Sequence, residues 1–381
     1  MLLYHLEIQT TANLNSSTPL APEPLTKTPS TKMAQPTRPP ANGFVAFCRK
    51  MYNPIGFSKG YNFILFLIFG GALMGFSLAR MPYLDYWGTF RAAKRSEKHY
   101  FEGGRVQAGM MLHLFTIVPA SLLACFQFVP AIRHRAMLLH RVNGYVVVLL
   151  SLASTAGALM MARVAAGGTV DTQTATGFLA VVFVAALAAA CYNVKRLQIE
   201  QHRAWMLRAW AYAGSIITMR LVFVVMIFVN SRAGYATVRE CAQIDYEMAG
   251  GGRARVLALF PSCEGFYSGN DAHAVAVVDA DMRGNEATVG SALVLSFGAA
   301  LWLALAIHMI GVEIYLQLTP AEHERLRNVS YQRQLEAGMK NPGRAGLTVD
   351  RFGDAEKWIP NSQRRLVGEQ QRNNDSDASS K

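Results

Sequence analysis

Six long apolar blocks, separated by polar connections, constrain the fold of this chain more than any other feature of its sequence. They cover residues 63–79, 106–129, 142–161, 177–194, 209–229 and 291–316. An α-helix needs about 20 apolar residues to cross a hydrocarbon core about 30 Å thick. The chain is also only 16 % charged, whereas soluble domains carry about 25 % charged residues. The sequence therefore predicts an all-α, polytopic transmembrane helix bundle with about six spans.

The segments outside the apolar blocks divide the chain into three parts. Residues 1–60 are polar and rich in proline, and residues 319–381 are polar and basic. Such compositions bury too little apolar surface to fold alone, so we expect both tails to be largely disordered. The transmembrane domain is expected over residues 61–318, with a four-helix core over about 106–230 and an extramembrane loop over about 231–290.

The net charge of +12 raises the question of nucleic-acid binding. The lysines and arginines, however, flank the apolar blocks, where they contact lipid headgroups and set orientation. The sequence contains neither a zinc-finger spacing nor an RNA-binding signature. The expected partner is thus the lipid bilayer and not a nucleic acid.

The distribution of basic residues predicts that both termini are cytoplasmic, because Lys and Arg near span ends are retained on that side. The organelle is not readable from the sequence. One connection, residues 80–105, disagrees, since it carries six basic residues. It also carries aromatic side chains, among them Tyr83, Tyr86, Trp87 and Tyr100. Either a short helix along the membrane surface or a solvated loop explains this composition.

The long loop contains two cysteines, Cys241 and Cys263. In a lumenal or extracellular loop such a pair can form a disulfide that closes a loop of about 20 residues. The alternative, two unpaired thiols, stays open, because spacing alone does not bring two Cα atoms close enough for a bond.

Strongly polar residues inside the apolar blocks are costly and usually face the interior of a bundle. His113 in the second block and Arg220 in the fifth are expected at similar depths, so they are candidates for one shared polar cavity. His308 and Glu313 lie in the last block and are candidates for an internal pair. For each histidine, a simple packing role is the alternative.

Two His-Arg pairs begin the third and fifth spans. The first is His140 and Arg141, and the second is His202 and Arg203, followed by Arg208. Imidazole and guanidinium groups at one depth suit a metal, a heme or an anionic headgroup. They also suit plain anchoring of helix ends at the headgroup layer, and both interpretations remain open.

These residues resemble a known family of predicted membrane proteins, domain-of-unknown-function family 2306. The resemblance rests on His113, on the runs 140–145 and 202–208, and on Met219-Arg220-Leu221. It covers about residues 109–229 and implies a four-helix membrane core without supplying a reaction. One departure is Tyr145, where family members often carry a basic residue, and this puts an anion-binding role of that motif in doubt.

Three functions compete at this point, and enzyme activity stays open. The first is a redox protein similar to cytochrome b561, in which heme b is held by histidines; the candidates are His113, His140, His202 and His308. The chain has no dinucleotide-binding fingerprint, so such a protein needs a separate electron donor. The second is a transporter, channel or lipid-headgroup-binding protein in which His113 and Arg220 line a polar cavity. Arg141, Arg203, Arg208 and Arg220 are the polar-site candidates. The third is a structural or interaction protein whose polar residues serve helix packing only. A membrane-protein partner is an open alternative to the separate electron donor. Oligomeric state is not readable, and no metal-ion site is predicted.

Overall fold

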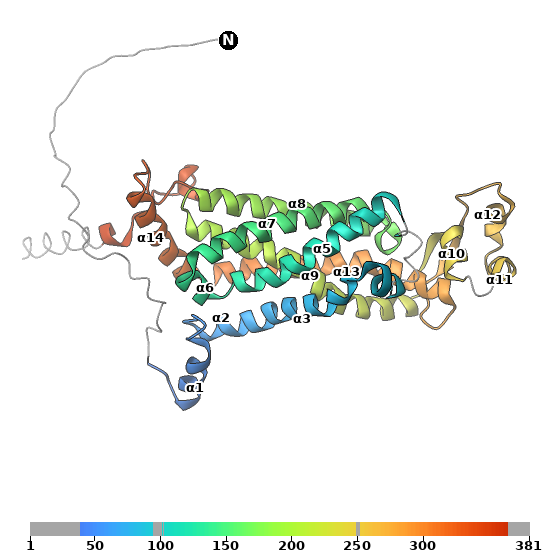
Figure 1. Ribbon diagram of the computed structural model, residues 1–381, viewed down its shortest axis with the longest axis horizontal. Coiled ribbons are helices and arrows are strands. Elements are labelled where there is room, and N and C mark those ends of the chain that lie inside the picture. Colours follow the sequence, from blue (N-terminus) through green and yellow to red (C-terminus); the bar gives the residue numbers. More distant parts are fainter. Residues whose placement is uncertain (1–38, 94–100, 102, 249–251, 365–381) are drawn as a thin grey trace, which may run out of the picture.

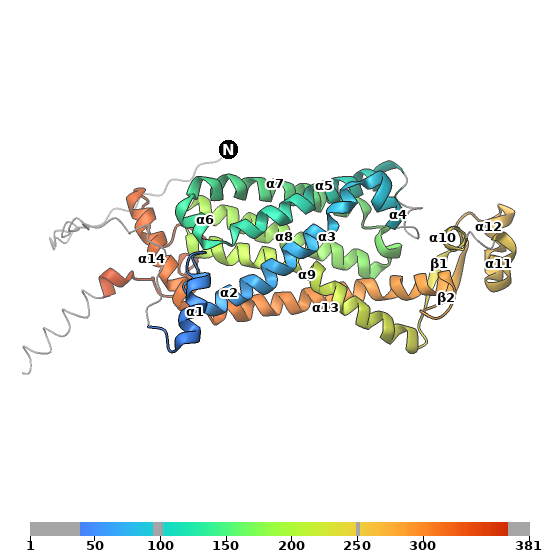
Figure 2. The same cartoon turned by 60° about the horizontal axis from the view of Figure 1, so that its bottom comes forward.

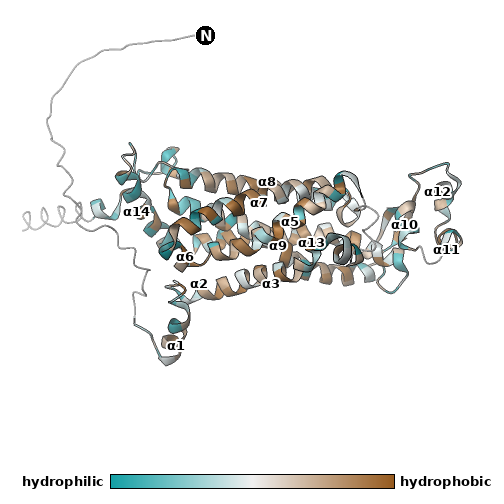
Figure 3. Ribbon diagram, viewed as in Figure 1, coloured by the Kyte–Doolittle hydropathy of each residue, from teal (hydrophilic) through white to brown (hydrophobic). Residues whose placement is uncertain are grey.

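Six helices dominate the computed structural model, which describes residues 39–93, 101, 103–248 and 252–364 (Figure 1). Helices long and apolar enough to cross a membrane cover Gly60–Leu84, Gly104–Gln127, Met137–Met161, Val170–Lys195, Ile199–Arg232 and Glu286–Gln317. Figure 3 shows apolar residues along these helices and hydrophilic residues at both ends of the bundle. The six predicted spans are therefore confirmed, and the protein is a multi-pass membrane protein.

The first span is built from several short pieces. It comprises α2 (Gly60–Leu65), a π-helical turn (Phe66–Gly70), α3 (Gly71–Arg80) and a 3-10 turn (Met81–Leu84). The other five spans are the single helices α5 (Gly104–Gln127), α7 (Met137–Met161), α8 (Val170–Lys195), α9 (Ile199–Arg232) and α13 (Glu286–Gln317). Packing is closest within the pair α5 and α7 and within the group α8, α9 and α13, while α3 contacts α5 and α9.

The two ends of the bundle differ in what they carry (Figures 1 and 2). One end, here called the α14 end, has α1 (Gly43–Tyr52), α6 (Pro130–Arg135) and α14 (Pro320–Glu336). The opposite end, the disulfide end, carries a small module between α9 and α13. This outer module consists of β1 (Ala236–Glu240), α10 (Cys241–Glu247), α11 (Gly252–Leu259), α12 (Glu264–Ser268) and β2 (Val275–Asp279).

The outer module has its own core and a disulfide. Its two strands pair antiparallel, with Val238 opposite Val277. The inward faces of the strands pack with Ile244, Met248 and Val256 from the helices. A disulfide joins Cys241 to Cys263.

The connection after the first span folds onto the bundle. It forms a π-helical turn (Tyr86–Phe90) and α4 (Arg91–Ala93). Tyr86 and Phe90 are buried with Phe101 against α5 and α7, and the Tyr86 hydroxyl donates to the Phe101 carbonyl. Aromatic packing, which a solvated loop would lack, thus shapes this connection. Tyr100 lies outside the described residues.

The expectation of disordered tails needs correction on both sides. Within residues 1–60, α1 ends at the buried Tyr52 and is followed by the buried side chain of Phe57. Within residues 319–381, α14 and the segment up to residue 364 are ordered. Both segments are polar in composition. The C-terminal segment is nevertheless ordered, because its polar side chains form hydrogen bonds with residues far away in the sequence.

A buried polar network holds the C-terminal segment to the turn between α8 and α9. The side-chain oxygen of Gln198 accepts from the Gln334 side-chain amide at 2.9 Å and from the Gly346 N–H at 2.8 Å. Ser330 donates to Glu200 at 2.6 Å. A Cβ on Gly346 would lie 2.4 Å from the Asn193 side chain, so only glycine permits this approach. The network fixes α14 against the start of α9.

Candidate functional site

His113 lies where α5 and α7 cross most closely. Its Nδ1 is 3.0 Å from the Ser154 carbonyl oxygen and 2.9 Å from the Ser154 hydroxyl. A carbonyl oxygen can only accept, so Nδ1 carries the hydrogen. The backbones of α5 and α7 come into close contact about one helical turn from His113, at Gly109 and Gly157. Ser154, which the sequence analysis did not single out, is therefore the partner of His113.

Arg220 lies in a different helix interface. Its side chain is exposed on α9, and its guanidinium sits 5.7 Å from the centre of the Phe297 ring of α13. The structure thus places His113 between α5 and α7 and Arg220 against α13, and does not bring them into the shared cavity that the sequence suggested.

His308 and Glu313 do not pair with each other. The buried His308 donates from Nδ1 to the Ala211 carbonyl at 2.7 Å, and its Nε2 accepts from the Thr218 hydroxyl at 2.7 Å. Glu313 instead binds Arg208 through both carboxylate oxygens, at 2.6 and 2.8 Å. Both contacts join α13 to α9. With both nitrogens engaged, His308 has no lone pair to offer to iron.

The first His-Arg motif forms a junction between α5 and α7. The Asn143 amide donates to the Leu123 carbonyl at 3.0 Å, and the Gln127 amide donates to the His140 carbonyl at 3.1 Å. The imidazole of His140 itself is not used in this junction. Its Nδ1 is buried, and within the described part of the chain it has no hydrogen-bond partner.

The second motif connects α9 to three other helices. His202 donates from Nδ1 to the Ala190 carbonyl of α8 at 2.9 Å. Arg203 donates to the Tyr315 hydroxyl of α13 at 2.9 Å, and that hydroxyl donates to Asn62 of α2 at 3.0 Å. These bonds set the direction of His202 and Arg203 at the α14 end.

A group of basic side chains gathers around Arg133, between α6, α7, α9 and α14. We call it the basic cluster, and it consists of Arg133, His140, His202, Arg203 and Arg325, with the single carboxylate Glu322. Each member interacts electrostatically with Arg133. The Arg133 guanidinium makes no hydrogen bond or ion pair with any residue that the structure describes.

Electrostatics in the basic cluster favour an added negative charge. Burial lowers the pKa of Arg133, Glu322 opposes this, and Arg325 and Arg203 lower it further. Burial alone would raise the pKa of Glu322, but Arg325 and the other guanidinium groups hold it below its usual value. Because Glu322 binds Arg325 at 2.7 and 2.9 Å, it is already engaged, and three guanidinium groups share one carboxylate.

The histidines offer limited support for heme. Ligation by two histidines requires two imidazole lone pairs that face one iron atom. His308 has both nitrogens engaged, and His113 lies in the separate interface of α5 and α7. Of the four candidates, the structure shows an electrostatic interaction only between His140 and His202. That pair lies among arginines, whose donors suit an anion directly.

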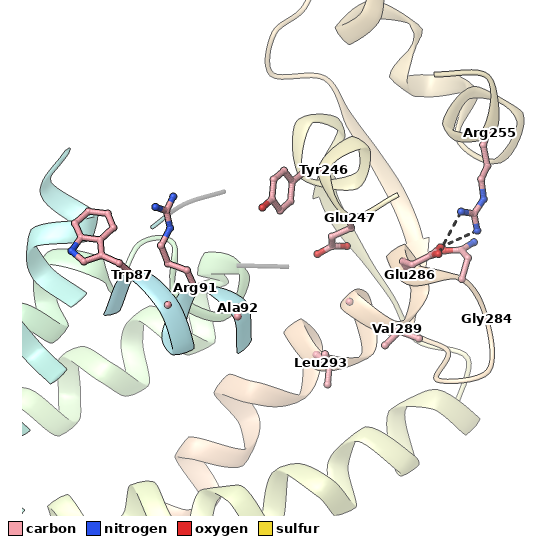
Figure 4. A pocket seen from close by; sticks show the side chains of 13 residues that line it. Trp87, Arg91, Ala92, Tyr246, Glu247, Arg255, Gly284, Glu286, Val289 and Leu293 are labelled. Atoms are coloured by element: carbon pink, nitrogen blue, oxygen red, sulfur yellow. Dashed lines mark hydrogen bonds and ion pairs between the residues drawn. The ribbon is translucent and has the colours of Figure 1, made fainter. Parts of the chain in front are cut away.

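A second candidate is a cavity at the disulfide end (Figure 4). It has a volume of about 1140 Å³ and lies between the connection after the first span, the outer module and the start of α13. Trp87 and Arg91 line one side, and Tyr246 lies on another. Its two carboxylates are already paired: Glu247 binds Arg239 at 2.7 Å, and Glu286 binds Arg255 at 2.9 Å. The basic cluster is therefore the stronger candidate.

The six apolar helices define a multi-pass membrane protein. Its cationic side chains cluster around Arg133 at the α14 end. Residues 110–243 match the model of a family of predicted membrane proteins, domain-of-unknown-function family 2306. The match contains His113, both His-Arg motifs and Arg220, and it confirms the resemblance expected from them.

One curated relative extends beyond that segment. The chain is 24 % identical over 335 residues to Ava biosynthesis cluster protein G from Aspergillus versicolor. The aligned region covers 75 % of this chain and 97 % of the relative. No solved structure matches the chain. The family model supports the membrane class, and neither the family description nor the relative's name gives a reaction.

Proposed function

We propose that this membrane protein binds a phosphate-type anion in the basic cluster at the α14 end. The observation that carries the proposal is Arg133, a partly buried guanidinium surrounded by further cations and without a hydrogen-bonding partner among the described residues. Guanidinium groups present planar, forked donors that match phosphate oxygens. A phosphate placed here would satisfy Arg133 and offset the repulsion between Arg133, Arg203 and Arg325.

The surroundings of the basic cluster strengthen its attraction for an anion and hold its arginine side chains in place. Charges in a partly buried region interact more strongly than charges in water. Tyr315 holds Arg203 in place, and the network around Gln198 holds α14, which supplies Arg325. The site is therefore preorganised by four helices, which reduces the entropic cost of binding.

Arg133→Gln is expected to weaken binding of inorganic phosphate at least about tenfold, because a charge-assisted contact of a buried group is worth about 1.5–3 kcal/mol. The measurement is the rise in the unfolding temperature of the full-length purified protein as phosphate is added, since a ligand that binds only the folded state stabilises it.

The matched control is Arg135→Gln, which removes an exposed arginine two residues away on the same helix. It should leave the phosphate response unchanged. Equal responses of the two variants would contradict the proposed site, and so would an unchanged response to phosphate when Arg133 is replaced.

We further propose that the α14 end faces the cytoplasm. Two features support this orientation: basic residues concentrate at that end, and the opposite end carries the Cys241–Cys263 disulfide. Disulfides persist in oxidising compartments. In sealed, right-side-out vesicles, we expect an impermeant maleimide to label Cys48 of α1 only after the membrane is permeabilised. Labelling of Cys48 in intact vesicles would reverse the orientation.

A further inference from the structure

Helix α1 exposes a row of large apolar side chains at the α14 end. Phe44, Phe47 and Met51 are 73 %, 61 % and 56 % exposed, and their spacing places them on one side of the helix. Arg49 and Lys50 lie in its last turn. In Figures 1 and 2, α1 runs across the long direction of the bundle instead of along it. Apolar residues beside basic ones, on a helix with this direction, are typical of helices that lie in a membrane surface.

The end of α1 and the residues after it pack against α2 and α6, and α6 carries Arg133. The rings of Tyr52 and Phe57 pack on Phe63 of α2, with centroids 5.8 and 5.7 Å apart. The Ala131 N–H of α6 donates to the Ile55 carbonyl at 2.9 Å. Gly56 has a φ of +97°, and a Cβ there would lie 2.7 Å from the Ala131 nitrogen. The depth of α1 in the membrane thus fixes the depth of α6.

The start of α7 presents a second apolar surface beside the basic cluster. Met137, Leu138 and Leu139 are 40 %, 75 % and 56 % exposed, and His140 follows them directly. The basic cluster is thus connected to α1 through α6, and it adjoins the exposed apolar residues of α7 through His140. A free anion in solution does not need such surfaces, whereas a lipid has acyl chains that would cover them.

We infer that the ligand of the basic cluster is the phosphate of an anionic glycerophospholipid, which enters sideways from the leaflet on which α1 lies. This inference rests on the proposed function and adds the source of the phosphate. The headgroup phosphate reaches Arg133 and Arg203, while the acyl chains remain along Leu138 and Leu139. Phe44 and Phe47 insert at the headgroup boundary and hold α6 at that depth.

The test uses the full-length protein in nanodiscs and two probes that carry the same phosphate chemistry. Phosphatidylserine represents the lipid, and its retention is measured by native mass spectrometry after release from the nanodiscs. Glycerol phosphate represents the soluble anion, and its binding is measured by the shift in unfolding temperature. We expect tight retention of phosphatidylserine and binding of glycerol phosphate that is at least about tenfold weaker, because only the lipid buries acyl chains.

Three variants separate the possible results. Phe44→Ser with Phe47→Ser is expected to lower phosphatidylserine retention several-fold and leave glycerol phosphate binding unchanged. Arg133→Gln should lower both. The matched control, Val238→Ser with Val277→Ser, removes an exposed apolar pair on the outer module and should change neither.

Each outcome has a distinct meaning. Binding of glycerol phosphate that depends on Arg133, without retention of phosphatidylserine, would overturn the lipid inference and leave the anion site standing. Retention that survives Arg133→Gln would overturn the proposed function itself. A third measurement places α1 directly: a fluorophore on Cys48, in a Cys191→Ala background, should be quenched by spin-labelled lipid. Quenching that is absent, or that appears only after removal of residues 1–38 or dilution of the protein, would show that another surface covers α1 and would contradict the inference.

Discussion

Arg239→Leu is expected to lower the free energy of unfolding of the outer module by about 3–5 kcal/mol, because it leaves a buried carboxylate without its guanidinium. Arg239 and Glu247 have side chains that are 2 % and 4 % exposed. They share two hydrogen bonds of 2.7 Å, and Arg239 also donates to the Ala287 carbonyl at 3.0 Å. The measurement is thermal unfolding of the purified protein under non-reducing conditions, which keep the disulfide intact.

The control for this prediction is an exposed ion pair that joins the same module to the start of α13. Arg255 and Glu286 are 41 % and 51 % exposed, and exposed pairs contribute about 0–1 kcal/mol. Arg255→Leu should therefore change unfolding little. Arg239→Leu combined with Glu247→Leu should recover part of the loss, because no buried charge then remains. An unfolding temperature of Arg239→Leu equal to that of Arg255→Leu would refute the assigned role.

Much of the fold follows from the sequence because lipid imposes a simple rule. A span must be long, apolar and helical, and this rule located all six long helices. Polar segments follow no such rule. The side chains of Gln198 and Gln334 are 136 residues apart in the sequence and form a hydrogen bond. Composition does not reveal such a contact, so it predicted disorder in a segment that is ordered.

The candidate site was harder to predict than the fold, for the same reason. The sequence directed attention to polar residues inside spans, and the structure shows His308 bonded to Thr218, 90 residues away. Arg133 lies between two spans, in a short helix, and resembles an ordinary flanking arginine. Arg133 is a candidate because Arg203, Arg325 and Glu322 lie close enough to interact with it. That proximity arises only in the folded bundle. The structure places His140 and His202, one from each His-Arg motif, near Arg133 at the α14 end.

The packing of α5 on α7 gives the second large expected effect. Gly157→Ala is expected to lower the free energy of unfolding by about 2–4 kcal/mol, from overpacking of about 1–3 kcal/mol and loss of an interhelical hydrogen bond of about 1 kcal/mol. A Cβ on Gly157 would lie 2.6 Å from the Gly109 carbonyl oxygen and 2.7 Å from the His113 nitrogen. Since both neighbours are backbone atoms, the helices must separate, and His113 loses contact with Ser154. Thermal unfolding in detergent measures this loss.

Gly177→Ala provides the matched comparison on α8. The substitution is chemically identical and also lies inside a span, but a Cβ on Gly177 meets nothing within 4 Å. Because alanine favours a helix over glycine by about 1 kcal/mol, Gly177→Ala should unfold at or above the temperature of the unmodified protein. Both variants gain the same helix propensity. They differ only in that the new Cβ at position 157 would meet the backbone of α5, whereas the one at position 177 meets nothing. If Gly157→Ala unfolds at the same temperature as Gly177→Ala, α5 and α7 do not cross as closely as described, and the position of His113 between them is wrong.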